Sequence, residues 1–183
     1  MVPAGLVESY PDPMRVVAGS LGGRKLVAPD GYNTRPTTDR VREALFNALG
    51  SLGVIDGALV ADLFAGSGAV GIEALSRGAE HCTFVENDRS ALGALDINIE
   101  TLGIADQSRV MRSDAVSAAA VIDVDVVLAD PPYDFHRWAD LISAVRADFF
   151  VAEAGDPVEA PAGWEQTRSR RYGRTWVTFL ERI

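Results

Sequence analysis

The chain has 183 residues, of which 48% are apolar, and its 17 Lys and Arg against 26 Asp and Glu give a formal charge of -9. A chain of this length buries roughly 70% of the surface of its unfolded form, so it can form one globular domain without disulfide or metal staples. Because the single cysteine excludes a disulfide framework and no apolar run approaches the ~18 residues of a membrane span, we expect a cytoplasmic protein without metal or membrane partner.

The beginning of the chain lacks the strand and helix alternation that follows it. We expect residues 1–13, which hold three prolines, to be a disordered extension. Two short apolar segments around glycines in residues 15–29 predict a small β-hairpin. After Pro36, apolar residues at helical spacing predict a helix that runs to about residue 49. Residues 14–50 should therefore form an N-terminal hairpin and helix.

The middle of the chain alternates apolar runs with helical patterns. This alternation predicts an α/β fold with a doubly wound, mostly parallel sheet, in which residues 51–183 form the core of a single domain spanning 14–183. Near the C-terminus, residues 164–180 predict two strands that turn near Tyr172 and Gly173. The expected core elements are strands at 58–64, 82–86, 109–112 and 124–129, and helices at 69–77 and 90–102.

A glycine motif with the sequence DLFAGSGAVG, residues 62–71, lies between a predicted strand and a predicted helix. Glycines here let the backbone approach a ligand, and Glu86, twenty residues after Gly66, could hold ribose hydroxyls. The spacing also fits an NAD-binding oxidoreductase. However, Asp62 would repel a pyrophosphate, and the chain is too short for a second substrate domain. An acid at this position suits a cationic ligand such as S-adenosylmethionine.

A second motif, Asp130, Pro131, Pro132 and Tyr133, directly follows a predicted buried strand. Two prolines fix φ and remove two N–H donors, so the turn offers carbonyl acceptors in fixed positions. Asp130 and the Pro131 carbonyl could accept both hydrogens of an exocyclic amine while Tyr133 stacks on the base. This motif predicts a site that acts on a nucleobase amine.

In this order, the glycine motif, Glu86, Asp114 and residues 130–133 resemble a class I S-adenosylmethionine-dependent methyltransferase. Residues 15–19, 23–26 and 34–43 narrow the resemblance to the RsmD family, which methylates N2 of one guanine in small-subunit (16S) ribosomal RNA. The similarity covers about residues 15–180, is strongest from 34 to 133, and weakens after Tyr133.

The resemblance implies a role for each matching position. Glu86 would bind the ribose hydroxyls, and Asp114, with Ser113 beside it, would accept from the adenine amino group. The catalytic residues would be Asp130, Pro131, Pro132 and Tyr133, acting by direct in-line methyl transfer without a metal. The implied cofactor-binding residues are Asp62, Phe64, Ala65, Gly66, Ser67, Gly68, Glu86, Asn87, Ser113, Asp114 and Asp130.

The acidic net charge argues against an RNA partner, but the charges are segregated along the chain. Residues 14–42 carry six basic and two acidic residues, residues 164–183 carry five and two, and residues 43–163 carry six and twenty. If both basic ends lie beside residues 130–133, they form a rim that faces phosphates. The candidate RNA-binding residues are Arg15, Arg24, Lys25, Arg35, Arg40, Arg168, Arg170, Arg171 and Arg174.

We expect a monomer, and the family implies that it acts on ribosomal RNA within an assembled or assembling small subunit. Two alternatives stay open. A DNA adenine N6-methyltransferase also uses an Asp-Pro-Pro-Tyr turn, although it normally needs a further target-recognition region. A catalytically idle RNA-binding ribosome assembly factor would keep the fold without turnover.

Overall fold

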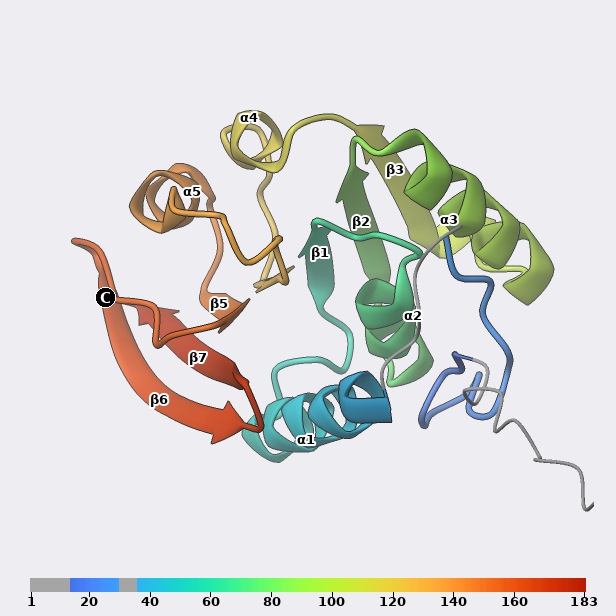
Figure 1. Cartoon of the computed structure of the whole chain (residues 1–183), viewed down its shortest axis with the longest axis horizontal. Helices are drawn as coiled ribbons and strands as arrows, with labels where there is room; N and C mark the ends of the chain where they lie inside the picture. The colour runs from blue at the N-terminus through green and yellow to red at the C-terminus, as the bar shows by residue number, and fades with distance from the viewer. Residues whose placement is uncertain (1–13, 30–35) are drawn as a thin grey trace, which may run out of the picture.

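A computed structural model of the chain describes residues 14–29 and 36–183, with side chains from Arg40 onward in the second range. The expectations for residues 1–13 and for Arg35 lie outside the described residues. A seven-stranded sheet runs through the molecule in the order β3-β2-β1-β4-β5-β7-β6 (Figure 1). The first five strands in this order are parallel, and β7 and β6 are antiparallel additions at one edge. The strands are β1 (Leu59–Leu63), β2 (His81–Glu86), β3 (Ser108–Arg112), β4 (Val126–Ala129), β5 (Phe149–Ala154), β6 (Trp164–Tyr172) and β7 (Thr175–Arg182).

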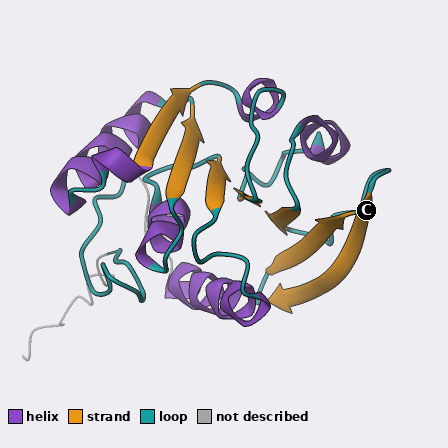
Figure 2. Ribbon diagram, turned by 180° about the vertical axis from the view of Figure 1, so that it is seen from behind, coloured by secondary structure: helices purple, strands orange, loops and turns teal. Residues whose placement is uncertain are grey.

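Helices cover both faces of the sheet (Figures 1 and 2). Side chains alternate between the two faces of a strand, and β4 shows this clearly, because Val126 and Leu128 belong to one core cluster and Val127 and Ala129 to the other. The first cluster includes residues of α1 (Pro36–Leu52), α2 (Ala69–Ser76) and α3 (Arg89–Leu102), and the second includes residues of α4 (Ala115–Ala119) and α5 (Trp138–Ala144).

The order of the strands places a topological switch point between β1 and β4. The chain moves outward from β1 through β2 to β3 and then returns to β4 on the other side of β1. In open α/β sheets, ligands bind in the crevice at the carboxyl ends of the strands at such a switch point. Both sequence motifs lie there, since the glycine motif follows β1 and residues 130–133 follow β4.

The predicted α/β architecture is confirmed, and four elements of the described chain were not predicted, among them the short 3₁₀ helix η1 (Ala105–Gln107). The expected strands and helices correspond to β1 to β4 and α1 to α3, and the two C-terminal strands correspond to β6 and β7. The structure adds the short helices α4 and α5 and the strand β5. The expected N-terminal hairpin is reduced to a single antiparallel bridge between Arg15 and Lys25.

No helix in the described parts of the chain is long and apolar enough to cross a membrane.

Candidate active site at the carboxyl edge of the sheet

The turn after β1 adopts the backbone conformation of a ligand-binding loop. Phe64, Gly66 and Gly68 all have positive φ, at 67°, 57° and 85°. A Cβ on Gly68 would lie 2.5 Å from the side chain of Leu95, so this glycine permits close packing of α3. At Gly66 a Cβ would meet nothing within 4 Å. The described chain therefore leaves open space next to Gly66, where the backbone can approach a ligand.

Asp62 lies beneath this turn, only 2% exposed, and its Oδ2 accepts a hydrogen bond from the Gly71 N–H at 2.8 Å. The pKa of Asp62 is raised from 3.8 to about 7, chiefly by burial; the Gly71 hydrogen bond lowers it, and the negative charges of Asp130 and Glu86 contribute to the rise. A cation bound near these three acids would favour their ionised forms. The electrostatics of the site therefore suit the positively charged ligand that Asp62 predicts.

Glu86, the last residue of β2, has its carboxylate fixed by three backbone N–H groups. Oε2 accepts from Gly66 at 2.7 Å, and Oε1 accepts from Asn87 at 2.7 Å and Asp88 at 2.8 Å. Asp88 in turn caps α3 by accepting from the Ala91 N–H. Glu86 is therefore held beside the glycine turn, in a position where its carboxylate could also accept from ribose hydroxyls.

Asp114 follows the carboxyl end of β3 and caps α4, and the capping bonds fix its carboxylate in place. Its Oδ1 accepts from the N–H of Ser117 at 2.9 Å and from the Ser117 hydroxyl at 3.1 Å. Ser113 lies beside it and donates through Oγ to the Asp114 carbonyl. Asp114 is exposed. Because β3 is parallel to β2 and β1, Asp114 lies at the same edge of the sheet as Asp62 and Glu86.

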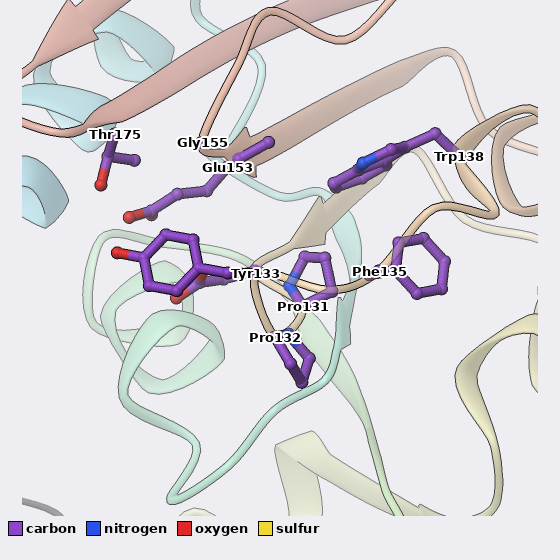
Figure 3. Close-up of a pocket in the computed structure, with 10 residues that line it drawn as sticks. Pro131, Pro132, Tyr133, Phe135, Trp138, Glu153, Gly155 and Thr175 are labelled. Atoms are coloured by element: carbon purple, nitrogen blue, oxygen red, sulfur yellow. The ribbon is translucent and has the colours of Figure 1, made fainter.

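A pocket that opens to solvent lies at the carboxyl ends of β4 and β5. In Figure 3, Tyr133, Glu153 and Thr175 lie on one side, Phe135 and Trp138 on the other, and Pro131 between them. Tyr133 is 69% exposed, so its ring is available for stacking. The lining residues are Asp130, Pro131, Pro132, Tyr133, Phe135, Trp138, Glu153, Ala154, Gly155 and Thr175.

Aromatic contacts join this pocket to the glycine turn. Phe64 packs edge-on against Phe135 with ring centroids 5.1 Å apart, and Phe135 packs against Trp138 at 5.2 Å. A non-glycine residue with positive φ costs about 1–2 kcal/mol, and the Phe64 ring contact helps to offset that cost. Trp138 therefore both packs on Phe135 and lines the pocket.

Glu153 is the ionisable residue of the pocket lining that the sequence motifs did not predict. Ala129 of β4 pairs with Ala152 of β5, so the next residues, Asp130 and Glu153, lie side by side at the strand ends. The pKa of Glu153 is raised to about 8, chiefly by burial and also by the charge of Asp130, while the charge of Arg42 opposes both effects. Asp130 as a whole residue is exposed to solvent, but its carboxyl group is largely buried. This burial raises the pKa of Asp130 to about 6. In the sequence, Glu153 could have been noticed as an acidic residue directly after the apolar run of residues 149–152.

The candidate RNA-binding residues divide between two regions. The four candidate arginines of the β6–β7 hairpin are all exposed; Arg174 adjoins the pocket residue Thr175, whereas Arg168 pairs with Phe179 further along the hairpin. The four are Arg168, Arg170, Arg171 and Arg174. Arg24, in contrast, donates to the Thr101 carbonyl in the last turn of α3, which leads to the amino end of β3. Arg24 and its exposed neighbour Lys25 therefore lie at the far end of the sheet. Arg15 and Arg40 are exposed as well.

The described residues contain no group of three or more His, Cys, Asp or Glu side chains that could hold a metal ion. The described residues at this edge present fixed carboxylates, carbonyl acceptors, a glycine turn and aromatic rings.

Comparisons with known proteins agree with this geometry. A family model described as conserved hypothetical protein 95 matches residues 14–181. Over 184 residues the chain is 40% identical to the putative rRNA methyltransferase YlbH of Bacillus subtilis (strain 168), covering 92% of this chain and 99% of that protein. It is 37% identical over 182 residues to ribosomal RNA small subunit methyltransferase D of Escherichia coli (strain K12), covering 92% and 90%. Among solved structures, the putative methyltransferase yhhF from Escherichia coli matches with a TM-score of 0.80 at 34% identity, covering 92% of this chain and 97% of that one.

Proposed function

Because the chain belongs to the RsmD family, described as conserved hypothetical protein 95, we propose that it transfers a methyl group from S-adenosylmethionine to the exocyclic N2 of a guanine in small-subunit (16S) ribosomal RNA. One observation carries the proposal. The Asp-Pro-Pro-Tyr turn forms one wall of a pocket that is joined by ring contacts to the glycine turn after β1. A base in the pocket and a cofactor on the turn would meet at the switch point.

The residues around the glycine turn fit S-adenosylmethionine. Asp62 and Glu86 provide negative charge for a cationic ligand, Gly66 leaves space beside the backbone, and Asp114 lies where an adenine amine could donate to it. The cofactor, when bound, supplies a methyl group that its sulfonium already activates. The implied neighbours Ala65, Ser67 and Asn87 lie in the same two loops.

The chain's own task is to hold the nucleophilic nitrogen in line and to make its lone pair available. Asp130 and the Pro131 carbonyl would accept the two N2 hydrogens, which favours a pyramidal nitrogen. Tyr133, with its ring exposed, would stack on the base once it leaves its RNA stack. The prolines at 131 and 132 keep this turn free of competing N–H donors.

The β6–β7 hairpin supports an RNA partner. Exposed arginines run along this hairpin from Arg174, beside the pocket residue Thr175, to Arg168, and they could contact phosphates of the RNA that flank an extruded base. In this proposal the enzyme acts as a monomer on RNA within an assembled or assembling small subunit.

The test is to incubate the protein with labelled S-adenosylmethionine and, separately, naked rRNA, small subunits or DNA, and to identify the product by nucleoside mass spectrometry. We expect N2-methylguanosine in small-subunit rRNA. N6-methyladenine in DNA would instead favour the adenine methyltransferase, and RNA binding without any methylated product would favour the idle assembly factor. Either result would overturn the proposal.

A further inference from the structure

The pocket contains a carboxyl group that the mechanism above does not use. Glu153 projects from β5 into the same space as Tyr133 and Thr175 (Figure 3). The pairing of Ala129 with Ala152 places it directly beside Asp130 on the neighbouring strand. Neighbouring strands lie roughly 4.8 Å apart, so two acceptor groups stand next to each other at the pocket floor.

Glu153 is partly buried, and within the described part of the chain its carboxyl group accepts no hydrogen bond. A desolvated carboxyl group without donors is unfavourable, because burial removes its hydration without replacement. Burial and the charge of Asp130 also raise its pKa, while the charge of Arg42 lowers it. N–H donors from a ligand in the pocket would relieve the remaining cost. Since the described residues do not donate a hydrogen bond to this carboxyl group, a ligand is a natural source of donors.

The Watson–Crick edge of guanine supplies the donors in a matching arrangement. Its N2 amine lies next to the ring N1–H, so two adjacent donor groups face outward. Adenine and cytosine place an acceptor nitrogen beside their amines, and uracil has no exocyclic amine. Of the four RNA bases, guanine is therefore the one that can donate to two adjacent acceptors at once, through its exocyclic amine and through the neighbouring ring N–H.

We propose that Glu153 is the residue that selects guanine, by accepting a hydrogen bond from N1–H while Asp130 and the Pro131 carbonyl hold N2. The inference rests on the proposed function and adds the origin of its base specificity. Adenine in the same position would place its N1 lone pair against the Glu153 carboxylate. A site built to pair with a hydrogen-bonding group rejects an analogue that lacks this group, because the buried partner is then left unpaired.

The decisive substrate is small-subunit rRNA that carries 2-aminopurine at the methylated position. This base keeps the amine at C2 but has no hydrogen on N1. We expect the wild-type protein to methylate guanine at least about 100-fold more efficiently in kcat/KM, consistent with the discrimination by sites built to hydrogen-bond a substrate. Glu153→Gln should lower this preference by about 10-fold or more, because its amide can turn to donate to N1 of 2-aminopurine.

Glu159→Gln is the matched control, because it makes the same chemical change at an exposed position outside the pocket lining. It should leave the preference unchanged. S-adenosylmethionine affinity, measured by calorimetry, should be unchanged in both variants. If Glu153→Gln folds poorly, Glu153→Asp keeps the acceptor and should retain the preference at a lower rate.

The outcomes separate the two proposals. An equal loss of activity on guanine and 2-aminopurine in Glu153→Gln, or loss of the preference in Glu153→Asp, would show a structural role and overturn the inference. A wild-type protein that methylates guanine N2 in no substrate would overturn the proposed function itself.

Discussion

Three carboxyl groups near the switch point have raised pKa values, and burial is the largest cause for each. The pKa values are about 7 for Asp62, about 6 for Asp130 and about 8 for Glu153. In the ligand-free protein these groups therefore bind protons more tightly than in the unfolded chain. A cationic cofactor and a base with N–H donors would each reverse this effect. The acids thus connect ligand binding to proton release.

This linkage predicts how stability depends on pH. Between about pH 4 and pH 8 the folded protein binds more protons than the unfolded one at these three groups, so the free energy of unfolding should fall as the pH rises. Asp62→Asn should reduce the slope by up to about 1.4 kcal/mol per pH unit between pH 5 and 6. Urea denaturation of the ligand-free protein at pH 5, 6, 7 and 8 measures it.

Asp96→Asn serves as the control, since Asp96 is an exposed aspartate paired with Arg112. An Asp62→Asn variant whose stability follows the same pH slope as the wild-type protein would contradict the raised pKa of Asp62.

At the scale of elements, α3 ties the N-terminal segment to the cofactor turn through one buried residue, Asn98. Its Oδ1 accepts from the Val27 N–H at 2.8 Å, and its Nδ2 donates to the carbonyls of Val27 at 3.0 Å and Ser67 at 2.9 Å. The buried Glu73 of α2 holds the same segment by accepting from Val17 and Ala18. Two helices therefore hold this segment.

Asn98→Ala should lower the free energy of unfolding by about 1–3 kcal/mol, because it leaves buried backbone groups without partners. It should also weaken S-adenosylmethionine binding, since the Ser67 carbonyl belongs to the glycine turn. Urea denaturation and calorimetry measure the two effects. Asn47→Ala, at an exposed position on α1, is the control. Unchanged cofactor affinity in Asn98→Ala would show that the glycine turn does not depend on this link.

The predictability of each element follows from its periodicity. The strands β1, β2 and β4 are apolar runs buried on both faces, and α2 and α3 have helical apolar spacing, so the sequence predicts them. The helices α4 and α5 have five and seven residues, too few for a clear period. The strand β5 falls where the family resemblance weakens. For this reason Glu153 was missed, since its role depends on strand pairing that local sequence does not contain.

The acidic net charge argues against an RNA partner, and the distribution of charge over the molecule removes only part of this conflict. The C-terminal basic residues lie on the hairpin next to the pocket, whereas Arg24 and Lys25 lie at the far end of the sheet. The described residues at the two basic ends of the chain therefore do not form one continuous rim. The hairpin should carry most of the phosphate contacts.

Charge reversal at two positions tests this division. Arg174→Glu, beside the pocket residue Thr175, should weaken binding to rRNA and flatten its dependence on salt concentration, because phosphate contacts release counterions. Lys25→Glu makes a similar change of charge at an exposed position away from the pocket and should have little effect. Filter binding between 50 and 200 mM salt measures both. Equal losses in the two variants would indicate that the whole surface attracts RNA without a defined rim.

The central claim is that methyl transfer takes place at the Asp-Pro-Pro-Tyr turn, and Asp130→Ala tests it most directly. The measurement combines single-turnover methylation of small subunits with calorimetric binding of S-adenosylmethionine by the same protein. We predict that methylation is lost while the cofactor dissociation constant stays within about threefold, a difference below 1 kcal/mol, since Asp130 acts chiefly on the base. Normal turnover in the variant would contradict the account.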